Sequence, residues 1–176
     1  MSDSGNPVPN ESIESAPRSR MVEWTDPLEV AAQGRQMGGL EFIRALIDGR
    51  VPPPPIVHLM RFTAVSADVG TVTFTCEPDE SMYNPLGTVH GGLVCALLDT
   101  VLGCATQTTL GVGQGYTSLE IKVNYLKPVL ASSGTLTATG TVTKPGRRAA
   151  FAEGTVVDAS GKLVATASST LLVFEH

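Results

Sequence analysis

A single carboxylate, Asp99, interrupts the apolar segment that spans residues 93–110. Aspartate is a poor helix-interior residue, and burying it without a partner is costly. Three structural explanations are open: Asp99 lies on a solvent-facing stripe of the helix, it pairs with a distant Arg or Lys, or it caps a second helix. Apolar helix neighbours such as Leu98 and Leu102 disfavour the solvent-facing stripe. The functional explanation is a carboxylate buried in an apolar wall beside a ligand cleft, where it becomes a usable base or nucleophile.

The string His90-Gly91-Gly92, directly before the apolar segment, supplies a second set of reactive groups. Backbone N–H groups in the first turn of a helix have no partner within the helix. Two glycines leave these amides open to a ligand, and the helix dipole favours negative charge there. The arrangement suits the oxyanion that forms when an ester or thioester carbonyl is attacked. A plain glycine turn into the helix, with an exposed His90, is the alternative.

The elements that must position these groups are one long helix and several strands. The apolar segment predicts a helix from Gly91 to Leu110, closed by glycines. Alternating Thr and small apolar residues between 135 and 143 are typical of a half-exposed antiparallel strand. Further β-branched segments predict strands at residues 56–66, 69–77, 116–126, 134–144, 147–158 and 162–175. A helix so apolar must be covered on most sides, so we expect an α+β fold with an antiparallel sheet wrapped around it.

The residues before this domain form an extension of different character. Residues 1–25 are rich in Ser, Asn, Pro and Glu without periodicity and are predicted to be a disordered tail. Residues 26–55 are predicted to form a helical extension, split into two short helices by glycines and followed by a proline-rich connector. The main domain is expected at residues 56–176.

Composition excludes several classes of protein. The 176 residues carry a formal net charge of -5 without a dense basic run, so nucleic acid is not an expected partner. No charged segment followed by an apolar one stands at the N-terminus, and Asp99 and Gln107 break the most apolar stretch, so neither a signal peptide nor a membrane span is predicted. The three cysteines lack metal-ligand spacing. We expect a cytoplasmic protein without a metal.

One string makes these signals specific: NPLGTVHGG, from Asn84 to Gly92, with Asp99 nine residues after His90. It resembles the signature of hotdog-fold acyl-CoA thioesterases, in particular the PaaI-like group related to 4-hydroxybenzoyl-CoA thioesterases. The resemblance continues through Tyr116-Thr117-Ser118, Asn124-Tyr125, Lys127-Pro128 and Gly146-Arg147-Arg148, and covers residues 56–174. It implies a hotdog fold, with the sheet wrapped around one central helix, and hydrolysis of an acyl-CoA to free acid and CoA.

The resemblance also implies a role for each catalytic candidate. Asp99 is the general base on a water molecule, or the nucleophile that forms a mixed anhydride. The amide of Gly91 polarises the thioester carbonyl, and Asn84 positions the water or the carbonyl. His90 holds the loop and helps to polarise the substrate, while Ser118 lies near the attacking water.

Substrate binding and assembly follow from the same likeness. Gly92 and Thr117 are expected to contact the substrate, and Arg147 and Arg148 to meet the phosphates of CoA. The family builds its site between two subunits, so a homodimer or a dimer of dimers is expected, with Asn84 and Gly91 of one subunit facing the carboxylate and the serine of the other. No cofactor is expected apart from the CoA of the substrate.

Two other functions remain open on this fold. A hotdog-fold enoyl-CoA hydratase or dehydratase uses a different histidine motif, and Met82 stands where that motif has an aspartate. Some hotdog proteins are non-catalytic acyl-CoA-binding modules joined to a DNA-binding domain, which the extension does not resemble. The acyl group is not defined by the sequence, although the low aromatic content of 5% favours an aliphatic pocket.

Overall fold

The structure is a computed structural model that describes residues 15–176. The first fourteen residues of the predicted tail therefore lie outside the described residues, and residues 15–26 form no helix or strand. Among the described residues, no helix combines the length and the apolar character needed to cross a membrane.

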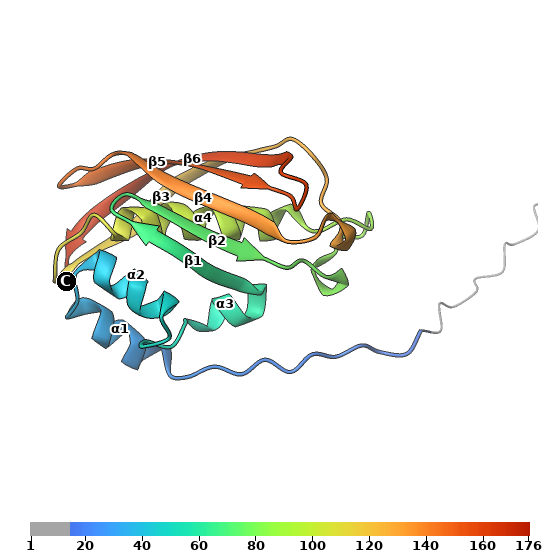
Figure 1. Ribbon diagram of the computed structural model, residues 1–176, viewed down its shortest axis with the longest axis horizontal. Helices are drawn as coiled ribbons and strands as arrows, with labels where there is room; N and C mark the ends of the chain where they lie inside the picture. The colour runs from blue at the N-terminus through green and yellow to red at the C-terminus, as the bar shows by residue number, and fades with distance from the viewer. Residues whose placement is uncertain (1–14) are drawn as a thin grey trace, which may run out of the picture.

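Six strands form one antiparallel sheet, as the alternating segments predict (Figure 1). The order across the sheet is β1-β2-β4-β5-β6-β3, so β1 and β3 are its two edges. A β-bulge between Ser118 and Glu120 interrupts the pairing of β3 with β6. The strands are β1 Phe62–Asp68, β2 Thr71–Cys76, β3 Gln114–Tyr125, β4 Leu136–Lys144, β5 Ala149–Val157 and β6 Leu163–Glu175.

The long helix α4, Gly91–Gln107, lies along the inner face of this sheet, which confirms the predicted α+β architecture. The helix ends at Gln107, earlier than predicted. The hydroxyls of Thr108 and Thr109 donate to the carbonyls of Ala105 and Thr106, so side chains satisfy the last turn instead of further helix. The buried residues of α4 recur at helical spacing: Leu93, Val94, Leu97, Leu98, Val101, Leu102, Gly103, Ala105 and Thr106.

One stripe of α4 is not covered by the sheet. Gly92 and Asp99 are exposed, and Cys95, Ala96 and Thr100 beside them are half-buried. These positions recur at intervals of three and four residues and so lie on one side of the helix. The prediction that Asp99 is buried is therefore wrong for the single chain, and the solvent-facing stripe that its apolar neighbours seemed to disfavour is what the fold provides.

Three short helices precede the sheet: α1 Pro27–Arg35, α2 Gly39–Ile47 and α3 Pro55–Met60. The split between α1 and α2 falls at the predicted glycines. The prediction of a strand from residue 56 is wrong at its start, because Pro55 stands at the first position of a helix, where its fixed φ is favourable. Arg61, with φ of 54°, ends α3 and turns the chain into β1.

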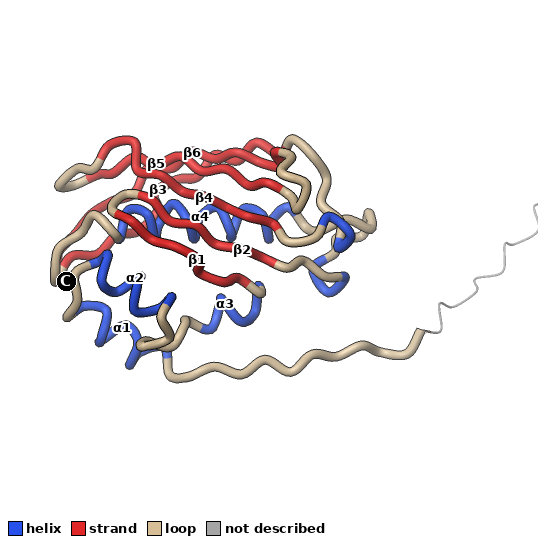
Figure 2. The backbone as a smooth tube through the Cα atoms, viewed as in Figure 1, coloured by secondary structure: helices blue, strands red, loops and turns tan. Residues whose placement is uncertain are grey.

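The extension, which in the structure runs through α3 to Met60, packs against the domain rather than apart from it. Figures 1 and 2 show α2 and α3 beside β1. A Cβ atom at Gly39 would lie 1.7 Å from the carbonyl oxygen of Gln107, so only glycine allows α2 to begin against the end of α4. The Gly39 amide donates to the Leu110 carbonyl at 3.0 Å, and Ile43, 2% exposed, joins the main core.

Candidate active site

Asp99 on α4 has one hydrogen-bond partner among the described residues, and that partner is a predicted site residue. The hydroxyl of Ser118 on β3 donates to Oδ1 of Asp99 over 2.7 Å. Adjacent strand residues face opposite sides of a sheet, and Tyr116 packs on Gly103 of α4, so Tyr116 and Ser118 face the helix. Thr117 faces the other side, and the structure does not bring it to the carboxylate.

A pocket of about 470 Å³ opens beside Asp99. Its lining is mostly apolar and comes from α4, β1, β2, Tyr116 and the extension. The low aromatic content of the sequence favoured a purely aliphatic pocket. The lining differs from that expectation, because Phe62 and Phe74 contribute aromatic rings. The carboxylate therefore lies at the wall of an apolar cavity, although its own side chain is exposed.

The Cys104 thiol and the Tyr116 hydroxyl are two of the ionisable groups near this carboxylate. Burial, with a smaller contribution from the negative charge of Asp99, raises the pKa of the Cys104 thiol to about 12. Burial also raises the pKa of Tyr116 well above its usual value. Both groups stay protonated at neutral pH, so neither competes with Asp99 as a base.

The first turn of α4 is capped by His90. Its Nδ1 accepts the N–H of Gly92 at 2.8 Å, which places the ring hydrogen of the neutral imidazole on Nε2. The Gly92 amide is therefore occupied by this cap, and the substrate contact of Gly92 stays a prediction. The Leu93 amide donates to the His90 carbonyl, while the N–H of Gly91 has no acceptor within residues 15–176. Gly91 thus carries the amide that is available to an oxyanion.

Tyr125, at the end of β3, covers this glycine. Its hydroxyl donates to the Gly91 carbonyl at 3.0 Å, and a Cβ atom at Gly91 would lie 3.3 Å from the ring. A second pocket, of about 280 Å³, is lined by Gly91, Val94 and Tyr125. Sequence reasoning gave Tyr125 no role, because only the paired strand end shows that it reaches the helix.

Asn84 shapes the loop before the helix. Its Oδ1 accepts the amides of Leu86 and Thr88, and its Nδ2 donates to the Thr88 hydroxyl at 3.0 Å. These contacts use one of its two amide hydrogens. The structure therefore shows a loop-building role and leaves one donor for the predicted contact with water or carbonyl.

Arg147 and Arg148 lie in the exposed turn between β4 and β5. Ala149, next in the chain, pairs with Leu172 of β6, which in turn pairs with Thr117 of β3. Two strand spacings, about 10 Å, separate this turn from the end of β3 near Ser118. The two arginines belong to the Asp99 end of the sheet, not to the Gly91 end.

The two groups that the predicted reaction needs, the Gly91 amide and the Asp99 carboxylate, lie far apart within one chain. Gly91 and Asp99 are eight residues apart on the same helix. At about 1.5 Å per residue they lie about 12 Å apart along the helix axis. A single carbonyl cannot contact both groups of one chain, so the carboxylate and the amide cannot act together unless a second copy supplies one of them.

Comparisons with known proteins give the context of this geometry. The sequence model of the thioesterase superfamily matches residues 86–165, which include Gly91, Asp99 and Ser118. Human acyl-coenzyme A thioesterase 13 is 31% identical over 113 residues, which cover 64% of this chain and 79% of that protein.

Solved structures extend the likeness. A thioesterase from Haemophilus influenzae is 25% identical, covers 77% of this chain and 90% of its own, and superposes with a TM-score of 0.66. A Streptococcus mutans protein bound to acetyl-CoA is 30% identical. The match covers 65% of this chain and 89% of that protein, with a TM-score of 0.60. The Escherichia coli PaaI protein, at 22% identity, covers 75% of this chain and 93% of its own, and with a TM-score of 0.67 it shares the fold alone.

Proposed function

The chain belongs to the thioesterase superfamily and has the hotdog fold, and from that premise we propose that it hydrolyses acyl-CoA to free acid and CoA. Family membership gives the reaction class, a thioester hydrolase. The observation that carries the finer proposal is the Asp99 carboxylate, held by Ser118 at the wall of an apolar pocket. A carboxylate beside an apolar cavity can act on the carbonyl of an acyl group that the cavity holds.

In the proposed reaction Asp99 removes a proton from a water molecule as the water oxygen attacks the thioester carbonyl. The carbonyl oxygen becomes an oxyanion that accepts the N–H of Gly91, aided by the positive end of the α4 dipole. The intermediate then collapses, the carbon–sulfur bond breaks, and the CoA thiolate takes up a proton. Direct attack by Asp99, with hydrolysis of the resulting anhydride, is the other route that this geometry serves.

The proposed active site is shared by two copies of the chain. The 12 Å between Gly91 and Asp99 is one support for this. The other is β3, an edge strand of twelve residues, which presents unpaired backbone groups together with the exposed side chains of Leu119 and Tyr125. A two-fold contact that pairs these edges would place each Asp99 opposite the Gly91 of the other copy.

The CoA moiety is proposed to meet Arg147 and Arg148. Both side chains are exposed and carry charge suited to phosphate. The Streptococcus mutans relative was solved with acetyl-CoA, which supports CoA as the carrier. The three cysteines are free thiols, which supports a reducing compartment such as the cytoplasm.

Thiol release from a panel of aliphatic and aromatic acyl-CoAs tests this function. The wild-type chain is expected to release CoA from several members of the panel. Loss of enoyl absorbance without thiol release would instead indicate a hydratase. Binding of acyl-CoA without turnover of any panel member would indicate a binding module and would overturn the proposal.

A further inference from the structure

The pocket beside Asp99 takes about half of its lining from the extension rather than from the domain that carries the chemistry. Ile47 stands at the end of α2, Pro53 and Pro54 in the connector, and Ile56 and Val57 on α3. All of these precede residues 86–165, which match the family. This part of the wall is therefore built by the segment that precedes the sheet.

The extension is fixed at α2. Arg44 donates from Nε to the Ala67 carbonyl at 3.1 Å and pairs with Asp68 at 3.0 Å, which ties α2 to the end of β1. Ile43 is buried in the main core. Three consecutive prolines, at positions 52–54, then stiffen the connector, because each fixes its own φ. The wall cannot retract from the pocket without breaking core contacts.

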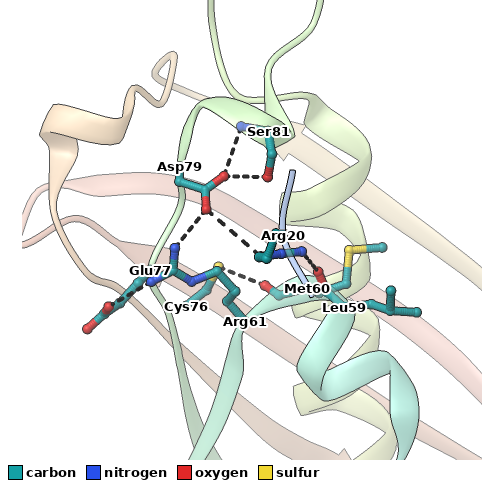
Figure 3. A network of polar contacts seen from close by, with 8 residues as sticks. All are labelled: Arg20, Leu59, Met60, Arg61, Cys76, Glu77, Asp79 and Ser81. Carbon is teal, nitrogen blue, oxygen red and sulfur yellow. Dashed lines mark hydrogen bonds and ion pairs between the residues drawn. The ribbon is translucent and has the colours of Figure 1, made fainter. Parts of the chain in front are cut away.

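The extension is also fixed at α3, as Figure 3 shows. Arg61, at the end of α3, pairs with Asp79 at 2.7 Å and with Glu77 at 3.4 Å. Arg20, from the segment before α1, donates to the Leu59 carbonyl at 2.8 Å and approaches Asp79 at 3.9 Å. Helix α3 is thus held both to β2's outgoing loop and to the N-terminal segment.

The size and lining of the pocket indicate what it holds. A cavity of about 150 Å³ is enough for one benzene ring. The pocket here, at about 470 Å³, is about three times as large, and most of its wall is apolar. A single-ring acyl group would leave much of it unfilled, whereas an extended aliphatic chain would fill it and gain from each buried methylene.

We propose that the extension, through Ile47, Ile56 and Val57, sets the length of the acyl chain, and that the site takes a medium- or long-chain aliphatic acyl group. This inference rests on the proposed thioesterase function, since it assigns the acyl part of that substrate to this pocket. A larger side chain at the extension wall shortens the pocket and lowers kcat/KM for long acyl chains selectively. A smaller side chain there lengthens the pocket and lets longer acyl chains bind.

The test compares two substitutions on α3 in the full chain. Ile56 lines the pocket and Leu59 does not, and their exposures are nearly equal at 44% and 45%. Ile56→Trp is expected to lower the ratio of kcat/KM for dodecanoyl-CoA over butyryl-CoA by about tenfold, because it excludes terminal methylenes. Leu59→Trp is expected to leave that ratio unchanged. Ile47→Ala is expected to raise the relative rate on hexadecanoyl-CoA. Thermal unfolding confirms that each variant is folded.

Three results would overturn the inference. One is an Ile56→Trp profile equal to that of Leu59→Trp, another is an equal loss on both chain lengths, and the third is a wild-type preference for phenylacetyl-CoA over every aliphatic substrate. If the wild type hydrolyses no thioester, the proposed function fails. Dodecanoyl-CoA and butyryl-CoA are then stable ligands, and calorimetric titration of the same variants decides the role of the extension separately.

Discussion

The two ends of the reactive segment of α4 differ in how they are completed. At its first turn His90 caps Gly92, Tyr125 of β3 covers Gly91, and the Gly91 amide has no acceptor among residues 15–176. Two turns further on, Asp99 accepts a hydrogen bond from Ser118 of the same strand and lies beside a pocket that takes part of its wall from the N-terminal extension. The helix thus carries the Gly91 amide, a binding group that its first turn already presents, and the Asp99 carboxylate, a reactive group whose pocket is built by other elements.

Removing the reactive group should have the largest effect. Asp99→Asn keeps the shape of the side chain but removes the base or nucleophile, so we expect kcat to fall by about a thousandfold or more. Because Asp99 is exposed, stability should change by less than about 0.5 kcal/mol. Thiol release and thermal unfolding measure the two quantities. A variant with undiminished turnover would refute the role of Asp99.

Removing the preformed group should have the next largest effect. Gly91→Pro deletes the N–H at the first helical position, where proline is otherwise favourable, and His90 already has the extended conformation that precedes proline. We expect kcat to fall by about a hundredfold. Gly91→Ala keeps the amide and is the matched control, although its Cβ, 3.3 Å from the Tyr125 ring, requires that ring to shift slightly. Equal losses in both variants would show that crowding, not the amide, is responsible.

A smaller effect is expected at the partner of the carboxylate. Ser118→Ala removes the 2.7 Å hydrogen bond that orients Asp99, and we expect a loss of about tenfold in kcat. Ser118→Thr retains a hydroxyl and should restore most of the activity. An alanine variant with wild-type kcat would mean that the pocket alone orients the carboxylate.

The surroundings of Gly91 offer a test by pH. Lys127, which lines the pocket next to Gly91, pairs with Asp158 at 2.5 Å, and this contact, together with Ser160 and Lys162, holds the pKa of Asp158 well below its usual range. A lowered pKa stabilises the fold above the unfolded value of about 3.9, and that stability is lost as the pH falls below it. Asp158→Asn should therefore lower Tm at pH 7, with a difference that shrinks below about pH 4. A difference independent of pH would contradict the ion pair's contribution.

The sequence predicted the parts that depend on local chemistry. Proline after Asp26 marks the start of α1, glycines separate α1 from α2, and alternating threonines mark β4. The adjacency of Asp99 and Ser118 followed from the family resemblance, and the structure brings the two together.

The rest depended on contacts that periodicity does not encode. The exposure of Asp99 is decided by where the sheet stops covering α4, and the apolar neighbours in the sequence point the other way. Helix α3 replaces the start of a predicted strand because Pro55 can begin a helix and Arg61 ends it in a left-handed conformation. The pocket wall could not be predicted, since it joins residues 46–58 to α4 across the fold.

Mixing the two inactive variants tests most directly whether the site is shared. Asp99→Asn and Gly91→Pro chains are unfolded together and refolded at equal concentrations. If each site combines Asp99 of one copy with Gly91 of the other, every mixed dimer has one intact site, and the mixture should recover about a quarter of wild-type activity. If each chain carries a complete site of its own, no intact site can form, and activity that stays at the level of the separate variants would contradict the account.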